Sequence, residues 1–272
     1  MSRVAGGEAT PSSVVCCDLD GVIWRGEEAI PGAADGVAKL RDAGLRVVFV
    51  TNNSGARVAD TVGRLAAMGI AAEPGDLATS AQAAASVLAR DLPDGARVLP
   101  CAGAGVIEAL HASGFVVVDD GPADAVVVGW HRTFDYERLR RAADAVRGGA
   151  RYVATNLDPT YPAAQGLLPG AGAIAAAVST ASGRAPEVAG KPEPPTVALV
   201  RDRFGDHGVM VGDRPSTDGA LADALGWPFA LVLSGVAGSP GEEGVPEPPP
   251  PFVASDLGAL APMLVRALGA RQ

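Results

Sequence analysis

Residues Val14–Gly21 read VVCCDLDG, a short apolar run that ends in two acids and a glycine. β-branched residues favour strands and Asp-Gly favours turns, so we expect a buried strand over Val14–Leu19 closed by Asp20-Gly21. Side chains two apart on a strand share a face, which places Asp18 and Asp20 together at its carboxyl end. A solvated turn after a strand has the same composition, so this pattern needs support from the rest of the chain.

The segments that follow alternate between helix and strand. Pro31–Ala43 has helical apolar spacing, Leu45–Val50 is a continuous apolar strand, and Val58–Met68 is a second amphipathic helix. Fully apolar strands separated by helices are typical of a parallel sheet that is covered on both faces. The N-terminal part of the chain therefore predicts an α/β fold.

The same alternation returns near the other end of the chain. There the pattern predicts helix Thr196–Phe204, strand Gly208–Val211, helix Ser216–Leu225, strands Phe229–Leu233 and Phe252–Ser255, and helix Asp256–Leu268. The region between has its own predicted strands (Arg97–Pro100, Phe115–Val118, Ala125–Gly129, Tyr152–Ala154) and helices (Gly105–Ser113, Tyr136–Arg147, Gly170–Ala181). About a hundred residues suffice for a domain, so we predict a discontinuous core, 1–80 plus 185–272, with an inserted α/β domain at 81–184.

Composition excludes several classes of protein. Acids outnumber bases 31 to 22 in the 272 residues and no segment concentrates Lys and Arg, which argues against a nucleic-acid partner. The apolar runs are far shorter than the roughly 20 residues of a membrane span. The residues Met1–Ser13 are small and polar, so we expect no signal peptide and a cytoplasmic location.

Cys16, Cys17 and Cys101 have no metal-site spacing and are expected to be buried thiols. Ser239–Pro251 is proline-rich and predicts an extended surface loop.

Three further motifs fall where chemistry is expected in an open parallel sheet, at the strand ends. Thr51 closes its strand with a hydroxyl, and the turn that follows offers the backbone N–H groups of Asn52 and Asn53 to a phosphoryl oxygen. Gly190-Lys191-Pro192 precedes a helix whose N-terminal dipole favours anions, although a surface lysine would read the same way. Each motif has a simpler structural explanation when it is taken alone. All of them fall at the same edge of the predicted sheet, which favours a shared function.

The last motif adds two more acids. Val209–Gly212 is an apolar strand that ends in Asp213, and Asp218 follows in the first turn of the next helix. Carboxylates without a neighbouring His or Cys select Mg²⁺ over Zn²⁺. Asp18, Asp213 and a phosphomonoester dianion sum to about −4, which Mg²⁺ and Lys191 largely neutralise with about +3. The sequence therefore predicts a site for a magnesium ion and a phosphoryl group.

These motifs together resemble those of the haloacid dehalogenase superfamily. The matching stretches are Asp18-Leu19-Asp20-Gly21-Val22, Thr51-Asn52-Asn53, Gly190-Lys191-Pro192, and Gly212-Asp213 with Asp218. The Thr-Asn-Asn form, the large insert and Ala154-Thr155-Asn156-Leu157-Asp158 resemble subfamily IIA, the NagD-like and p-nitrophenyl phosphatase branch. This resemblance implies a Rossmann-like core with an inserted type-2 cap. The branch includes phosphoglycolate, glycerol-phosphate and pyridoxal-phosphate phosphatases.

The resemblance also implies a role for each core residue. Asp18 would be the nucleophile and Asp20 the general acid and base. Mg²⁺ would be held by Asp18, the backbone carbonyl of Asp20 and Asp213, with support from Asp218. Thr51, Asn52 and Lys191 would bind the phosphoryl oxygens. Pro215 looks atypical for the branch and is expected to alter the start of its helix without removing a ligand.

In the family one cap loop faces the leaving group, and here it corresponds to Asn156–Gly170. Asn156, Asp158 and Tyr161 are the expected cap-side contacts, although packing within the cap would equally explain Tyr161. The loop contains no Lys or Arg, which favours a small, neutral or weakly polar leaving group. Relatives dimerise through the cap, so a homodimer is a further expectation.

The predicted function is a Mg²⁺-dependent phosphatase of small phosphorylated metabolites. Family resemblance in the cap loop ranks glycerol 3-phosphate first, with 2-phosphoglycolate and pyridoxal phosphate next, and p-nitrophenyl phosphate as a substrate in vitro. Two alternatives stay open: a phosphotransferase or mutase of the same superfamily, and a non-catalytic phospholigand sensor. Dehalogenase chemistry is disfavoured because it does not need Asp20.

Overall fold

The computed structural model describes residues 13–163, 166–238 and 243–269. The prediction made from Met1–Ser13 therefore lies almost wholly outside the described residues, and the one made from Ser239–Pro251 lies partly outside them.

The first sheet has six strands, all parallel, in the order β15-β14-β13-β1-β4-β5. They are β1 (Val14–Cys17), β4 (Arg46–Thr51), β5 (Leu77–Thr79), β13 (Gly208–Gly212), β14 (Phe229–Val232) and β15 (Phe252–Ala254). The strand from which the sequence analysis started lies near the middle, where Cys16 is in register with Val48 of β4 and Met210 of β13. The two halves of the discontinuous core thus join through β1.

Alternate residues of β1 enter two different hydrophobic clusters, as the two-residue period of a strand requires. Val14 and Cys16 belong to the cluster that includes α3 (Ser80–Ala89), α7 (Pro194–Phe204) and α8 (Ala220–Leu225). Val15 and Cys17 belong to the cluster that includes α1 (Ala33–Asp42), α2 (Val58–Ala67) and α9 (Leu257–Gly269). The sheet is therefore covered on both faces, as its apolar strands predicted.

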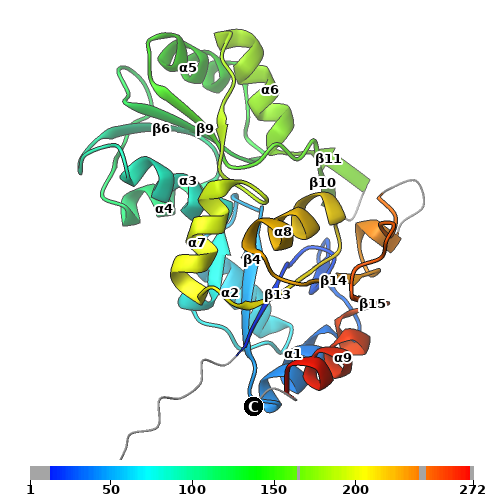
Figure 1. The fold of residues 1–272 in the computed structure, drawn as a ribbon. Helices are drawn as coiled ribbons and strands as arrows, with labels where there is room; N and C mark the ends of the chain where they lie inside the picture. The colour runs from blue at the N-terminus through cyan, green and yellow to red at the C-terminus, as the bar shows by residue number, and fades with distance from the viewer. Residues whose placement is uncertain (1–12, 164–165, 239–242, 270–272) are drawn as a thin grey trace, which may run out of the picture.

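A second sheet of five parallel strands forms the other part of the molecule, in the order β12-β9-β8-β6-β7 (Figure 1). Its elements are β6 (Arg97–Cys101), β7 (Val116–Val117), β8 (Ala125–Val128), β9 (Arg151–Ala154), β12 (Glu187–Val188), α4 (Ala104–Ala112), α5 (Tyr136–Arg147) and α6 (Ala171–Ser182). We call residues 80–188 the insert unit and the six-stranded sheet with α1, α2 and α7–α9 the core unit.

Several short elements were not expected from the sequence. They are the hairpins β2 (Trp24–Arg25) with β3 (Glu28–Ala29) and β10 (Thr160–Ala163) with β11 (Gly166–Pro169), the strands β5 and β12, helix α3, and the 3₁₀ turns η1 (Pro74–Asp76) and η3 (Val236–Gly238). β12 pairs with β9, so the second sheet continues past residue 184, where the sequence-based division ended the insert. Figure 1 shows the β10–β11 hairpin extending from the insert unit toward α8 of the core unit.

The helix predicted over Ser216–Leu225 begins differently from the expectation. Pro215–Gly219 forms one π turn, η2, and the α-helix α8 starts only after it. Pro215 occupies the first position of this turn, where a missing N–H costs nothing. The N–H groups of Asp218 and Gly219 both reach the carbonyl of Arg214, at 2.8 and 3.4 Å. The wide turn carries Asp218 back toward the end of β13.

Two simpler expectations can be compared with the described part of the chain. Cys16, Cys17 and Cys101 are free, buried thiols, as predicted. In the same residues no helix has both the length and the apolar composition needed to cross a bilayer.

Phe49 provides a test of the packing around β4. It is fully buried, so Phe49→Ala should lower the free energy of unfolding by roughly 3–5 kcal/mol through lost burial and a residual cavity. Tyr136→Ala is the matched control, because this aromatic side chain is 80% exposed and should change stability by about 0.5 kcal/mol or less. Urea unfolding followed by circular dichroism measures both. Equal effects of the two substitutions would contradict the packing described.

Candidate active site

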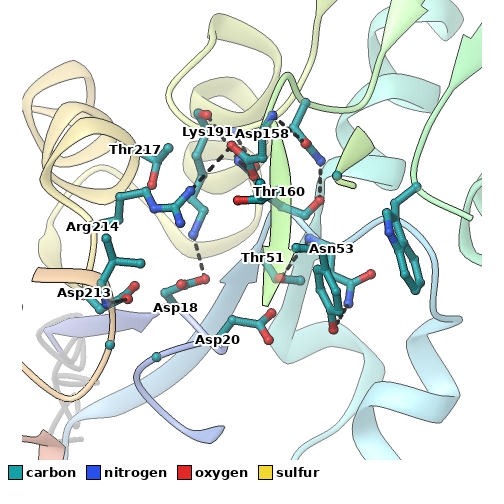
Figure 2. Close-up of a pocket in the computed structure, with 18 of the residues that line it drawn as sticks. Asp18, Asp20, Thr51, Asn53, Asp158, Thr160, Lys191, Asp213, Arg214 and Thr217 are labelled. Atoms are coloured by element: carbon teal, nitrogen blue, oxygen red, sulfur yellow. Dashed lines mark hydrogen bonds and ion pairs between the residues drawn. The ribbon is translucent and has the colours of Figure 1, made fainter. Parts of the chain in front are cut away.

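The four sequence motifs converge at the carboxyl edge of the six-stranded sheet. Asp18 follows β1, Thr51 ends β4 and Asp213 follows β13, and these three strands are neighbours in the sheet. Lys191 comes from the segment between β12 and α7. Figure 2 shows Asp18, Asp20, Thr51, Lys191 and Asp213 around one cavity. This edge is where open α/β sheets bind their ligands.

Lys191 lies at the centre of this group. Its Nζ is 2.6 Å from Oδ1 of Asp18 and 2.7 Å from Oδ1 of Asp218, and its side chain is only 3% exposed. Burial would lower the pKa of Lys191, but the two carboxylates outweigh burial and raise the pKa above its ordinary value. The amine is therefore a permanent positive charge inside the site.

The backbone beside Lys191 is fixed by close packing. The N–H of Lys191 donates to Oδ1 of Asn52 at 2.8 Å. A Cβ at Gly190 would lie 2.4 Å from the carbonyl oxygen of Thr155 and 2.6 Å from Oδ1 of Asn52. Only glycine fits at this position, which explains why a glycine precedes Lys191 in the motif.

Asp218 is fully buried, and hydrogen bonds occupy both of its carboxylate oxygens. Oδ2 accepts from the N–H groups of Asp213 at 3.2 Å and Arg214 at 3.1 Å, and Oδ1 accepts from Lys191. The carboxylate of Asp213 accepts from the N–H of Val236 at 2.5 Å. Asp218 thus orients Lys191 and the turn after Asp213.

Three carboxylates form a cluster with the composition of a hard-cation site. One oxygen each of Asp18, Asp213 and Asp218 lies within 4.8 Å of the others. Burial raises the pKa of Asp18 well above its ordinary value, against the opposing charge of Lys191. Burial and then the charge of Asp218 raise the pKa of Asp213 to about 6. When all three carboxyl groups are ionised, the single charge of Lys191 leaves two negative charges. A divalent cation with oxygen ligands balances them.

Asp20 is held differently from Asp18. Its Oδ1 accepts a hydrogen bond from Nε1 of Trp24 at 3.0 Å, and burial raises the pKa of the carboxyl group. Trp24 itself comes from the β2–β3 hairpin, and the guanidinium of Arg64 lies 4.1 Å from the centroid of its ring. A carboxyl group with a raised pKa beside a nucleophile is suited to donate a proton.

The side chains after Thr51 link the core to the insert unit. The N–H of Asn53 donates to Oγ1 of Thr51 at 3.0 Å. Nδ2 of Asn52 donates to Oδ2 of Asp158 at 3.2 Å and to the carbonyl of Lys191 at 3.4 Å. The side chain of Asn52 therefore connects two motifs and the insert unit, so any contact of this residue with phosphate is left to its backbone.

The three residues predicted from the insert all reach this part of the core. Nδ2 of Asn156 donates to the carbonyl of Asn52 at 2.7 Å, and Oδ1 of Asn156 accepts from the N–H of Asp158 at 3.1 Å. The hydroxyl of Tyr161 accepts from Nδ2 of Asn53 at 3.4 Å. The structure thus brings Asn156, Asp158 and Tyr161 together with the Thr51-Asn52-Asn53 motif.

A cavity of about 220 Å³ lies between the two units. Its lining includes residues that the sequence analysis did not single out: Trp24, Arg25, Trp130, Arg214 and Thr217. The rings of Trp130 and Tyr161 lie 4.8 Å apart, which gives the insert side an aromatic wall. Trp130 follows β8 at the carboxyl edge of the second sheet, so the strand-end rule used for the core would have found it. Arg214 stands directly after Asp213.

Comparison with known sequences and structures places the chain among characterised proteins. Residues 15–116 match the family of haloacid dehalogenase-like hydrolases, and residues 188–260 match a second, HAD-hydrolase-like family. D-glycerol 3-phosphate phosphatase of Mycobacterium tuberculosis is 42% identical over 80% of this chain, which spans 62% of that protein. Acid sugar phosphatase of Staphylococcus saprophyticus is 40% identical, with 74% of this chain and 78% of that protein aligned.

Solved structures agree with these sequence matches. The crystal structure of glycerol phosphate phosphatase from Mycobacterium tuberculosis in complex with magnesium has a TM-score of 0.81 and 36% identity, over 92% of this chain and 76% of that one. The p-nitrophenyl phosphatase from Archaeoglobus fulgidus has a TM-score of 0.83 and 31% identity, over 94% and 100% of the two chains. With its four motifs on a parallel-sheet core and its inserted α/β unit, the chain belongs to the haloacid dehalogenase-like hydrolases.

Proposed function

We propose that this protein is a Mg²⁺-dependent phosphatase that hydrolyses a small phosphorylated metabolite through a phosphoaspartyl intermediate. The observation that carries the proposal is the buried contact of Asp18 with Lys191, in a cavity that is also lined by Asp20 and Asp213. The phosphatase names of the relatives in Mycobacterium tuberculosis and Staphylococcus saprophyticus support it.

The donor set of the site fits a magnesium ion. Asp18, the backbone carbonyl of Asp20 and Asp213 would hold the ion, while Asp218 supports them through its bonds to Lys191 and the backbone. A bound Mg²⁺ would neutralise the phosphoryl oxygens and so favour attack by an anionic nucleophile. Magnesium in the related Mycobacterium tuberculosis structure supports this choice of metal.

In the first chemical step a carboxylate oxygen of Asp18 attacks phosphorus. The new bond joins this oxygen to phosphorus, and the bond between phosphorus and the leaving-group oxygen breaks. Asp20 gives its proton to that oxygen, so the leaving group departs as a neutral alcohol. Lys191 and the hydroxyl of Thr51 stabilise the charge on the transferring phosphoryl oxygens.

In the second step Asp20, now a carboxylate, takes a proton from water. The oxygen of this water attacks phosphorus and the bond to Asp18 breaks, which releases phosphate and restores both carboxyl groups. The hydrogen bond from Trp24 holds Asp20 in place through both proton transfers. Asp20 therefore acts as an acid in the first step and as a base in the second. This double role requires a carboxyl group beside the nucleophile Asp18.

The insert, predicted at 81–184, is proposed to act as a cap that selects the substrate. Asn156, Asp158 and Tyr161 form the insert side of the cavity, and the small cavity favours a compact leaving group. Glycerol 3-phosphate is the first proposed substrate because a relative with 42% identity carries that name. A homodimer through the cap and a cytoplasmic location complete the proposal.

Turnover with and without metal tests the reaction. The wild type should release p-nitrophenol from p-nitrophenyl phosphate in the presence of Mg²⁺, and EDTA should abolish this activity because the carboxylate cluster then repels the dianion. Asp18→Asn should reduce the rate by at least about 1000-fold, since an amide is not a nucleophile here. Equal phosphate release by Asp18→Asn and wild type would refute the mechanism. Metal-dependent binding of a phosphomonoester without any turnover would instead favour a sensor.

Gly21 tests the placement of Asp213. Gly21 has φ +83°, and an added Cβ would lie 2.3 Å from Oδ2 of Asp213. Gly21→Ala should therefore displace this carboxylate and remove most of the rise in melting temperature that Mg²⁺ gives the wild type. Gly121→Ala is the control, because Gly121 has the same φ of +83° with open space around it. It should lower stability by about 1 kcal/mol and keep the full Mg²⁺ response. A full response in Gly21→Ala would contradict the role of Asp213.

A further inference from the structure

Arg214 and Asp158 face each other across the cavity. Arg214 follows the proposed metal ligand Asp213 in the core unit, and Asp158 belongs to the insert unit. Nη1 of Arg214 lies 4.0 Å from Oδ1 of Asp158, and the two side chains are 23% and 27% exposed (Figure 2). Both residues line the same cavity as Asp18 and Asp20.

This ion pair is loose compared with the other contacts of the site. A separation of 4.0 Å exceeds hydrogen-bond length, whereas Lys191 approaches its two acids at 2.6 and 2.7 Å. A guanidinium group has five N–H donors, and one distant carboxylate satisfies few of them. Oδ2 of Asp158 accepts from Asn52, which keeps its Oδ1 toward Arg214. With respect to the part of the chain that the structure describes, Arg214 thus keeps N–H donors for a ligand that enters the cavity.

The other charged groups of the lining already have defined contacts. Lys191 is held by Asp18 and Asp218, and Asp20 accepts from Trp24. The guanidinium of Arg25 donates to the backbone carbonyl of Ser234. Among the described residues that line the cavity, Arg214 and Asp158 form the ion pair between the core unit and the insert unit, so they are placed to contact the leaving group of a substrate.

We propose that Arg214 binds the leaving group of the substrate and that Asp158, by balancing its charge, makes the site prefer a neutral hydroxylated leaving group over a carboxylate. This inference rests on the proposed phosphatase function. A hydroxyl can accept from Arg214 and donate to Asp158, so a polyol uses both members of the pair. A carboxylate can use only Arg214 and is repelled by Asp158.

The test compares kcat/KM for glycerol 3-phosphate and 2-phosphoglycolate, two small substrates in which the leaving group carries a neutral diol and a carboxylate, respectively. The wild type should prefer glycerol 3-phosphate. Asp158→Asn keeps the shape and an acceptor for Asn52 but removes the negative charge, so the ratio should move toward 2-phosphoglycolate by about tenfold. A fraction of unfolded enzyme cancels in this ratio because both substrates meet the same preparation.

Two further variants separate the pair from general effects. Arg214→Gln should move the ratio the opposite way, and Asp158→Asn with Arg214→Gln should lose the gain of the single Asp158 variant, since no cation is left to bind the carboxylate. Asp120→Asn is the charge-matched control, because this side chain is 66% exposed on the insert unit and is absent from the cavity lining. It should leave the ratio unchanged.

The possible outcomes distinguish the inference from the function on which it rests. If Asp158→Asn and Arg214→Gln lower kcat/KM for both substrates by the same factor, the pair only holds the two units together and the inference is wrong. An unchanged ratio in both variants, or an equal shift in Asp120→Asn, overturns it as well. If the wild type with Mg²⁺ releases phosphate from neither substrate nor p-nitrophenyl phosphate, the proposed function itself has failed.

Discussion

The contact of Lys191 with Asp18 and Asp218 is the interaction around which the site is organised. An ammonium group with 3% exposure is unfavourable unless carboxylates surround it. Asp18 directly follows β1, and Asp218 accepts hydrogen bonds from the N–H groups of Asp213 and Arg214, which follow β13. Three features fix the positions of Lys191 and its two acids. They are the wide turn at Pro215–Gly219, the missing side chain at Gly190 and the hydrogen bond from Lys191 to the side chain of Asn52.

The positions of Asp18, Thr51 and Asp213 at strand ends explain why the sequence was sufficient to predict them as parts of one site. In a parallel sheet, residues that follow neighbouring strands must meet at one edge. Asp18, Thr51 and Asp213 each follow an apolar run that is easy to recognise, so their convergence required only the order of the strands. The fold class follows from the same runs, because fully apolar strands between amphipathic helices need cover on both faces.

The elements that escaped prediction lack such a signal. α3 is buried on almost every side, so its alanine-rich sequence has no polar stripe to mark a helix. The β10–β11 hairpin contains two prolines and lies within a segment that otherwise reads as a loop. The role of the Asn52 side chain depends on a backbone group 139 positions away, which no local pattern records. The partnership of Arg214 with Asp158 is equally remote in sequence.

Asn52 has a mechanical consequence beyond its chemistry. The insert unit begins at Ser80, whose hydroxyl donates to the carbonyl of Asn52, and the chain returns to the core at Lys191, whose N–H donates to the Asn52 side chain. Asn156 bonds the same carbonyl from inside the insert unit. Both connections of the insert unit thus share one pivot residue next to the reacting groups. Any movement of the insert unit relative to the core unit acts on these hydrogen bonds. Entry of a substrate between the units and the position of Lys191 are therefore coupled through Asn52.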